Sequence, residues 1–191
     1  MSRIRAFVAL DLPERVVAAV GAWQAEALAG REGLRPIRPD ALHLTLAFLG
    51  HREQGEIDRA EEVVMARQSD TRAVPIELEP EPVGLPRRRP RVVAFGAVSA
   101  LASDLQGRIA ADLVAAGLLA PERRPWWPHL SVARVRKGAS IAGLPPLPGG
   151  PGHTFDAVRV ALYRSELGPQ GARYSTLAGF DLPQTAADKE I

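Results

Sequence analysis

Residues 42–50 read LHLTLAFLG and residues 128–134 read PHLSVAR, so one short phrase occurs twice, 86 residues apart. Each copy contains His, Leu, a hydroxyl residue, an aliphatic residue and Ala in that order, although the chain has only four histidines. Alternate residues of a strand share a face. His43 and Thr45 are therefore expected on one face of a strand, with the leucines and Phe48 on the other. A histidine that serves only the core needs no such copy.

The second phrase predicts the same kind of strand. Alternation places one group on a single face, namely His129, Ser131 and Ala133, and another group on the opposite face, namely Leu130, Val132 and Arg134. Each phrase therefore predicts a strand that is anchored in the core by one face and presents an imidazole and a hydroxyl on the other. If the two strands pack about a pseudo-twofold axis, both pairs line one groove.

The segments around the phrases also repeat. Apolar residues 4–10 and 91–98 predict buried strands, and helical spacing follows each of them, with Asp11 as the expected N-cap of the first helix and Ser99 or Ser103 as that of the second (99–118). A further helix is expected around 54–68 and a strand over 73–80. Because strand, helix and histidine-bearing strand occur twice in this order, the sequence indicates an internal duplication.

Composition limits the class of protein. A chain of 191 residues fits one globular domain or two small lobes that share a core. The absence of cysteine excludes disulfides and thiolate metal sites. No apolar run reaches the roughly 18–20 residues that span a bilayer, and the apolar run near the N-terminus is too short for a signal peptide. A cytoplasmic protein without membrane contact is therefore expected.

The charge composition leaves two explanations open. Only two of the 24 basic residues are lysine, and the sequence pI is about 9.5 although the net charge is +2. Arginine suits bidentate contacts with phosphate. A GC-rich genome, which the Ala, Gly, Pro and Arg usage suggests, produces the same bias without any functional reason.

Two imidazoles in matched contexts favour acid–base chemistry on a phosphorus centre. One neutral and one protonated histidine can coexist near neutral pH, so one takes a proton from water while the other gives a proton to the leaving oxygen. A zinc site is the main chemical rival, but the phrases supply two imidazoles and no carboxylate on the same face, so no metal is expected. A nucleophilic Ser131 lacks the Gly-x-Ser-x-Gly elbow.

With these motifs the sequence resembles the two-histidine (2H) phosphoesterase superfamily, which is defined by two His-x-(Thr/Ser)-x motifs. HLTL (43–46) and HLSV (129–132) match them. Within that superfamily the chain is similar to the bacterial and archaeal RNA 2′,3′-cyclic phosphodiesterases, once called 2′-5′ RNA ligases. The resemblance extends over RAFVALDLP, RRRPRVVAFGAV, LYRSEL and GARYSTL, and so over nearly the whole chain.

The resemblance implies a fold and an activity. The fold would be bilobal, duplicated α+β, with two antiparallel sheets facing a central cleft and helices outside. The single domain 1–191 would consist of pseudo-symmetric lobes, roughly 1–85 and 86–185, with terminal strands able to cross between them. The activity would be hydrolysis of 2′,3′-cyclic phosphate ends to 2′-phosphomonoesters without metal or other cofactor. Partners would be RNA or oligonucleotide ends, tRNA fragments included, and the protein would be a monomer.

The resemblance also implies roles for site residues. His43 would be the proton donor and His129 the proton acceptor, while Thr45, Ser131 and Arg134 would contact the phosphate. Alternation points Arg134 away from His129, so this role requires a bulge or a strand end after Ala133.

Weaker candidates and alternative functions remain open. Phe7 is either a platform for a base or a core residue, Arg5 and Arg164 add positive potential to the cleft, and one of Trp126 and Trp127 forms a wall of the groove. The basic run of Arg87, Arg88, Arg89 and Arg91 either contacts RNA or is a solvated turn. The alternative functions are reversible 2′-5′ ligation and a noncatalytic module that binds a nucleotide or RNA.

Overall fold

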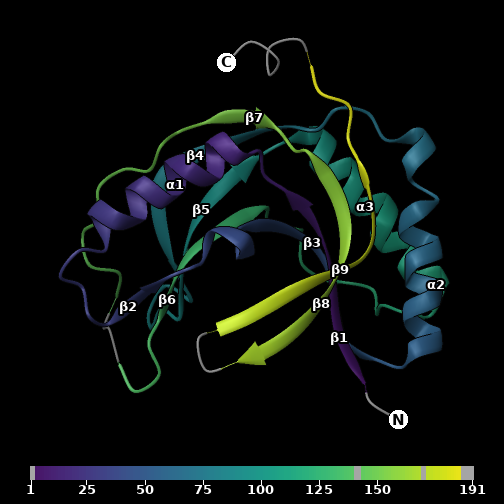
Figure 1. Cartoon of the computed structure of the whole chain (residues 1–191), viewed down its shortest axis with the longest axis horizontal. Helices are drawn as coiled ribbons and strands as arrows, with labels where there is room; N and C mark the ends of the chain where they lie inside the picture. The colour runs from purple at the N-terminus through teal and green to yellow at the C-terminus, as the bar shows by residue number, and fades with distance from the viewer. Residues whose placement is uncertain (1–2, 140–142, 169–170, 186–191) are drawn as a thin grey trace.

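The computed structural model describes residues 3–139, 143–168 and 171–185 (Figure 1). Its elements are, in chain order, β1 (Ile4–Asp11), α1 (Glu14–Ala27), β2 (Leu34–Pro36), η1 (Pro39–Ala41), β3 (His43–Arg52), α2 (Gln54–Met65), η2 (Gln68–Asp70), β4 (Pro75–Leu85), β5 (Val92–Val98), α3 (Ala100–Ala115), β6 (His129–Val135), β7 (Thr154–Asp156), β8 (Arg159–Gly168) and β9 (Gly171–Asp181). The strands and helices expected around the two phrases are confirmed, and β2 was not predicted.

Within the described residues, the strands form one curled antiparallel sheet of two halves. The first half-sheet is β3, β1, β8 and β9, and the second half-sheet is β7, β4, β5 and β6, with β2 beside β6. The halves join where β3 meets β6, at the register pair Leu44–Leu130. The predicted α+β class with antiparallel strands around a cleft is confirmed, and the two predicted sheets are halves of this single curled sheet.

Segments from both ends of the chain contribute to each half-sheet. Strand β8 pairs with β1 and β9 pairs with β8, whereas β4, from the N-terminal half of the chain, pairs with β5 and β7. The division into lobes at about residue 85 stays a prediction.

Helices α1 and α3 cross from one half-sheet to the other, whereas α2 stays with the half-sheet that it follows. Helix α1 follows β1 but packs against β6 and β5, where the rings of Trp23 and Phe95 lie 4.8 Å apart. Helix α3 follows β5 but packs against β3, and α2 covers β1, β8 and β9 (Figure 1). Each half-sheet is therefore supported by a helix that starts in the other half, which ties the two together.

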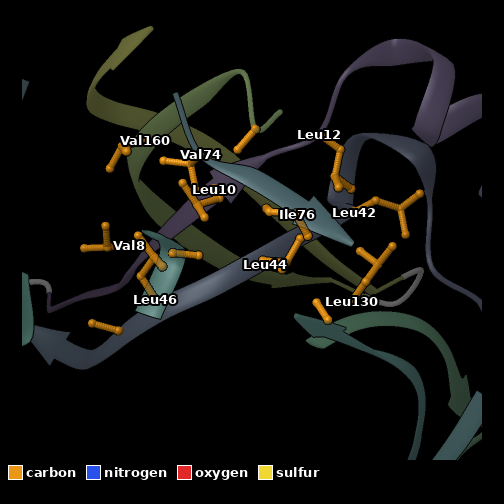
Figure 2. Close-up of a cluster of buried hydrophobic side chains, with 14 of the residues drawn as sticks. Val8, Leu10, Leu12, Leu42, Leu44, Leu46, Val74, Ile76, Leu130 and Val160 are labelled. Atoms are coloured by element: carbon orange, nitrogen blue, oxygen red, sulfur yellow. The ribbon is translucent and has the colours of Figure 1, made fainter. Parts of the chain in front are cut away.

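The core lies on the face of the strands opposite the phrase histidines. Figure 2 shows Val8 and Leu10 of β1 among side chains of β3 and β6. Leu10, Leu44 and Leu130 are completely buried. Since burial of such a side chain contributes about 1.5–3 kcal/mol, this face fixes which way His43 and His129 point.

A β-bulge interrupts alternation at the same place in both phrases. In β6, Val93 pairs with Ala133 but Ala94 pairs with Ser131, so Val132 is an extra residue. In β3, Val8 pairs with Ala47 but Ala9 pairs with Thr45, so Leu46 is an extra residue. The fourth and fifth residues of each phrase are consequently both buried. The small alanine in fifth place fits against the core at the bulge.

The bulges correct two predictions. Phe48, expected in the core, is 64% exposed, and Ala133, expected beside His129, is fully buried. Because a bulge adds one residue to the strand, each later side chain points to the face opposite the one that strict alternation predicts. Arg134 is therefore on the histidine face, as the family pattern required, and Phe48 occupies the equivalent position in the first phrase.

A glutamine from each crossing helix contacts a bulge carbonyl. Gln24 of α1 is buried, and its Nε2 donates to the carbonyl of Val132 at 2.7 Å and to that of Ile37 at 2.9 Å. Gln106 of α3 donates to the carbonyl of Leu46 at 3.3 Å. Each bulge carbonyl thus has a side-chain donor, which at Val132 adds to the backbone N–H of Ile37 at 2.9 Å.

Two further predictions have clear outcomes. Asp11 is not the N-cap of α1, because that helix starts after Pro13 without a side-chain cap, and the carboxylate of Asp11 instead accepts from the hydroxyl of Tyr163 at 2.7 Å. Ser99 does cap α3, since its Oγ accepts from the backbone N–H of Ala102 at 3.0 Å.

None of the helices in the described ranges has the length and apolarity needed to cross a bilayer.

Candidate active site

Both phrases open onto one cleft of about 910 Å³ on the concave face of the sheet. Its lining includes all five residues that were predicted to act directly on the substrate, namely His43, Thr45, His129, Ser131 and Arg134. Arg5 and Phe7 also line it. Arg164 is not among the lining residues, and its guanidinium pairs with the carboxylate of Glu166 at 2.9 Å.

The two histidines have the same backbone hydrogen bond. Nδ1 of His43 lies 2.9 Å from the carbonyl oxygen of Ala41, and Nδ1 of His129 lies 3.0 Å from that of Trp127. A carbonyl can only accept, so Nδ1 of each ring must carry the proton. In the neutral ring Nε2 is then the free base, which leaves Nε2 as the atom for proton transfer at both positions.

An aromatic ring lies against each imidazole. Phe7 stacks on His43 with ring centroids 4.8 Å apart, and Tyr174 of β9 meets the same imidazole edge-on at 5.3 Å. Trp127 stacks on His129 at 4.8 Å with an interplanar angle of 14°. Phe7 is only 4% exposed. It therefore orients His43 from behind and offers little surface to a base.

The surroundings of His43 favour its neutral form. The pKa of His43 is lowered from 6.5 to about 4, mainly by burial; the hydrogen bond with Ala41 opposes this shift, and the positive charges of His129 and Arg134 add to it. Without a ligand, His43 is therefore neutral at pH 7. Its Nε2 then accepts from the hydroxyl of Thr45, whose Oγ1 is 3.1 Å away. An anion bound nearby would raise this pKa, because it would stabilise the imidazolium.

The described residues do not contain a candidate metal centre, since no three His, Asp or Glu side chains among them are grouped closely enough to hold an ion.

The basic run at 87–91 lies outside the lining of the cleft. Trp126 donates from Nε1 to the carbonyl of Thr45 at 3.1 Å and so braces β3 beside the histidine.

Several residues at or near the cleft were missed from the sequence. Phe48 was assigned to the core because the bulge was not foreseen. Tyr174, Arg35 and Gln24 are isolated residues without a motif, and the sequence contains no signal that would bring them to the site. One feature of the sequence could have indicated the bulges, namely the alanine that follows the bulged residue in both phrases.

Fold and site together define an acid–base catalyst. Two imidazoles with Nε2 available, two hydroxyls and a guanidinium share one cleft, and each imidazole is held by the same local contact. A neutral and a protonated imidazole on either side of a phosphate can transfer protons in opposite directions, while hydroxyl and guanidinium donors stabilise the charge on its oxygens.

The comparisons with known proteins agree with this class. The chain belongs to the 2′-5′ RNA ligase superfamily, whose family model matches residues 12–168. It is 31% identical over 185 residues to an RNA 2′,3′-cyclic phosphodiesterase of Methanothermobacter thermautotrophicus, with 94% of this chain and 100% of the relative covered. It is 32% identical over 195 residues to a protein of the same name from Thermus thermophilus, with 94% and 90% covered.

Solved structures share the fold. The crystal structure of E. coli LigT complexed with 3′-AMP superposes with a TM-score of 0.77 at 26% identity, covering 95% of this chain and 99% of that one. The predicted membership of the two-histidine phosphoesterases is thereby confirmed.

Proposed function

We propose that this protein hydrolyses the 2′,3′-cyclic phosphate at the end of an RNA chain to a 2′-phosphomonoester. The observation that carries the proposal is the pair of imidazoles, His43 and His129, that present Nε2 to one cleft together with Arg134. Two relatives named RNA 2′,3′-cyclic phosphodiesterase support the reaction, and the crystal structure of E. coli LigT complexed with 3′-AMP supports binding of a nucleotide.

In the proposed reaction, Nε2 of His129 takes a proton from water as the water oxygen attacks phosphorus. The bond between phosphorus and O3′ breaks, and O3′ takes the proton from Nε2 of His43. Thr45, Ser131 and Arg134 hold the nonbridging oxygens, where negative charge grows in the transition state. The 2′ ester bond is untouched, so the product is a 2′-phosphomonoester. Because His129 gains a proton and His43 loses one, each histidine ends in the protonation state in which the other began.

The role of His43 as donor depends on the substrate. Its pKa of about 4 means that the imidazole lacks the required proton in the empty cleft at pH 7. The cyclic phosphate carries one negative charge, which opposes the effect of Arg134 and His129 and favours the imidazolium. Substrate binding and protonation of His43 are therefore coupled, so that His43 acts as an acid when a substrate is bound whose O3′ can receive the proton.

The test is an assay with 2′,3′-cyclic AMP and with a trinucleotide that ends in a 2′,3′-cyclic phosphate, with the product identified by phosphorus NMR. We expect the 2′-phosphomonoester from both. His43→Ala and His129→Ala should each lower the rate about 10²–10⁴-fold, and EDTA should have no effect. Full activity in either variant contradicts the paired mechanism. Tight binding of 2′-AMP without turnover of either substrate would instead support the noncatalytic binding module.

Ligation would use the same steps in the same direction, with a ribose 5′-hydroxyl in place of water as the nucleophile and O3′ again as the leaving group. Incubation of tRNA halves without ATP would detect it. Action on tRNA fragments, and action as a monomer in the cytoplasm, stay predictions from the sequence.

A further inference from the structure

Positive charge is concentrated in the cleft. Among the described residues that line it, six are Arg or Lys and none is Asp or Glu, although the whole chain has 24 basic and 22 acidic residues. The six are Arg5, Arg35, Arg38, Arg134, Arg136 and Lys137, and of these Arg38 is already paired with the carboxylate of Asp40, with Nη2 2.6 Å from Oδ2. All but Arg5 belong to two short segments, residues 35–38 from β2 to η1 and residues 134–137 at the end of β6. We call these two segments the basic wall.

The basic wall contains a pair of like charges that the sheet forces together. Arg35 of β2 and Arg134 of β6 are direct register partners, so their Cβ atoms are about 4.5–5.5 Å apart. Both line the cleft. Two guanidinium groups therefore stand side by side in the cleft, where they can contact neighbouring anionic groups of one ligand.

Arg35 also reaches across the edge of the cleft. Its guanidinium lies against Gly171, the first residue of β9, where a Cβ atom would be 2.9 Å from Nη1. Gly171 has φ +115°, a conformation that favours glycine. Arg35 thus extends from the second half-sheet to the hairpin β8–β9 of the first. Its guanidinium therefore lies at the edge of the cleft, next to Gly171.

The opposite wall has a different chemistry. Phe48 is 64% exposed and lies 6.2 Å, between ring centroids, from Phe7, and Tyr174 and Leu167 also line this side. An aromatic face accepts an unstacked base, whereas guanidinium and ammonium groups accept phosphate. The two sides of the cleft therefore offer different contacts, with aromatic rings from β3 and β9 and most of the positive charge from the segments at β2 and β6.

A single cyclic phosphate cannot account for the basic wall. It carries one negative charge, and Arg134 with the two hydroxyls and two imidazoles already serves it under the proposed function. We propose that Arg35, Arg136 and Lys137 form a second phosphate subsite, which holds the phosphodiester on the 5′ side of the terminal nucleotide. The preferred substrate is then the end of an RNA chain, and a cyclic mononucleotide leaves the subsite empty.

This inference rests on the proposed function, and the experiment separates the two. kcat/KM is measured for 2′,3′-cyclic AMP and for the trinucleotide with a 2′,3′-cyclic end, as a function of salt concentration, in the wild type, Arg35→Gln and Lys137→Gln. Arg59→Gln, an exposed arginine of α2 outside the cleft, is the matched control. Turnover of either substrate by the wild type establishes the activity independently of the subsite.

We expect the wild type to prefer the trinucleotide and Arg35→Gln to lower that preference about tenfold, which is the size of one charged hydrogen bond. The lower preference should come mainly from a higher KM for the trinucleotide. The negative slope of log(kcat/KM) against log[salt] for the trinucleotide should become less steep by about 0.7. Lys137→Gln should act in the same direction, and Arg59→Gln should leave the preference and the slope unchanged. An unchanged preference in both cleft variants, or equal kcat/KM for the two substrates in the wild type, overturns the subsite. Failure of the wild type to turn over either substrate overturns the proposed function instead.

Discussion

Replacement of Gln24 by Met tests whether the bulge in β6 depends on its contact with α1. Gln24 is 6% exposed, and its amide donates to the carbonyls of Ile37 and Val132. Methionine has a similar length and can fill the same space, so the substitution removes the two hydrogen bonds and leaves little cavity. The carbonyl of Val132 keeps the N–H of Ile37 as a donor at 2.9 Å, whereas the carbonyl of Ile37 loses its side-chain donor.

The cost can be estimated from these contacts. Each hydrogen bond contributes about 0.5–1.5 kcal/mol net, so the two together give a loss of about 1–3 kcal/mol in the free energy of unfolding. For a chain of this size each 1 kcal/mol lowers Tm by about 2–4 °C. Because Val132 is the extra residue that turns Arg134 into the cleft, relaxation of the bulge should also weaken phosphate binding.

Urea unfolding and steady-state kinetics on 2′,3′-cyclic AMP check this prediction. Gln106→Met, which removes one longer bond from the equivalent bulge, should cost about half as much. Gln54→Met, which removes an exposed bond to Asp58, should cost almost nothing and is the control. We expect a higher KM for Gln24→Met at temperatures where it is fully folded. If Gln24→Met unfolds at the same urea concentration as Gln54→Met and keeps its KM, the bulge does not depend on Gln24.

Three shorter predictions follow from single contacts. Folding lowers the pKa of His43 from 6.5 to about 4. As the pH falls from 6.5 toward 4, the unfolded chain therefore binds a proton at His43 before the folded protein does, so a contribution of about 1–3 kcal/mol to the unfolding free energy, present above pH 6.5, is lost. His43→Gln should therefore flatten the decline of the unfolding free energy between pH 6.5 and 4, and an unchanged slope in urea titrations would refute the assignment. Trp127→Ala should lower kcat, because the ring that stacks on His129 holds the imidazole in its orientation, whereas Trp127→Phe should restore most of the loss; an equal kcat in the two variants would argue against this role. Ser99→Ala should lower the unfolding free energy by about 1 kcal/mol through loss of the cap on α3, while Ser103→Ala, whose hydroxyl bonds only within the helix, should cost less.

Local sequence pattern was sufficient for the elements and for the chemistry. Apolar periodicity predicted β1, β3, β5, β6 and the helices within a few residues, since burial of one face is a local property of a strand or helix. The copied phrase identified His43 and His129, and the structure brings them into one cleft. Their roles in proton transfer stay predictions, because they concern a substrate.

The sequence alone determined which residues are candidates for the chemistry, because the motif residues recur at fixed spacing and their side chains are intrinsically acid, base or donor. Tertiary structure decided where those side chains point and what surrounds them. A bulge changes the face of every later residue while leaving the composition of the strand unchanged, so Phe48 and Arg134 could be placed only in three dimensions. The same holds for Gln24, Arg35 and Tyr174, which approach the phrases through strand pairing and helix crossing between distant segments. The low pKa of His43 likewise depends on burial and on charges that fold against it, and neither can be read from its neighbours in the chain.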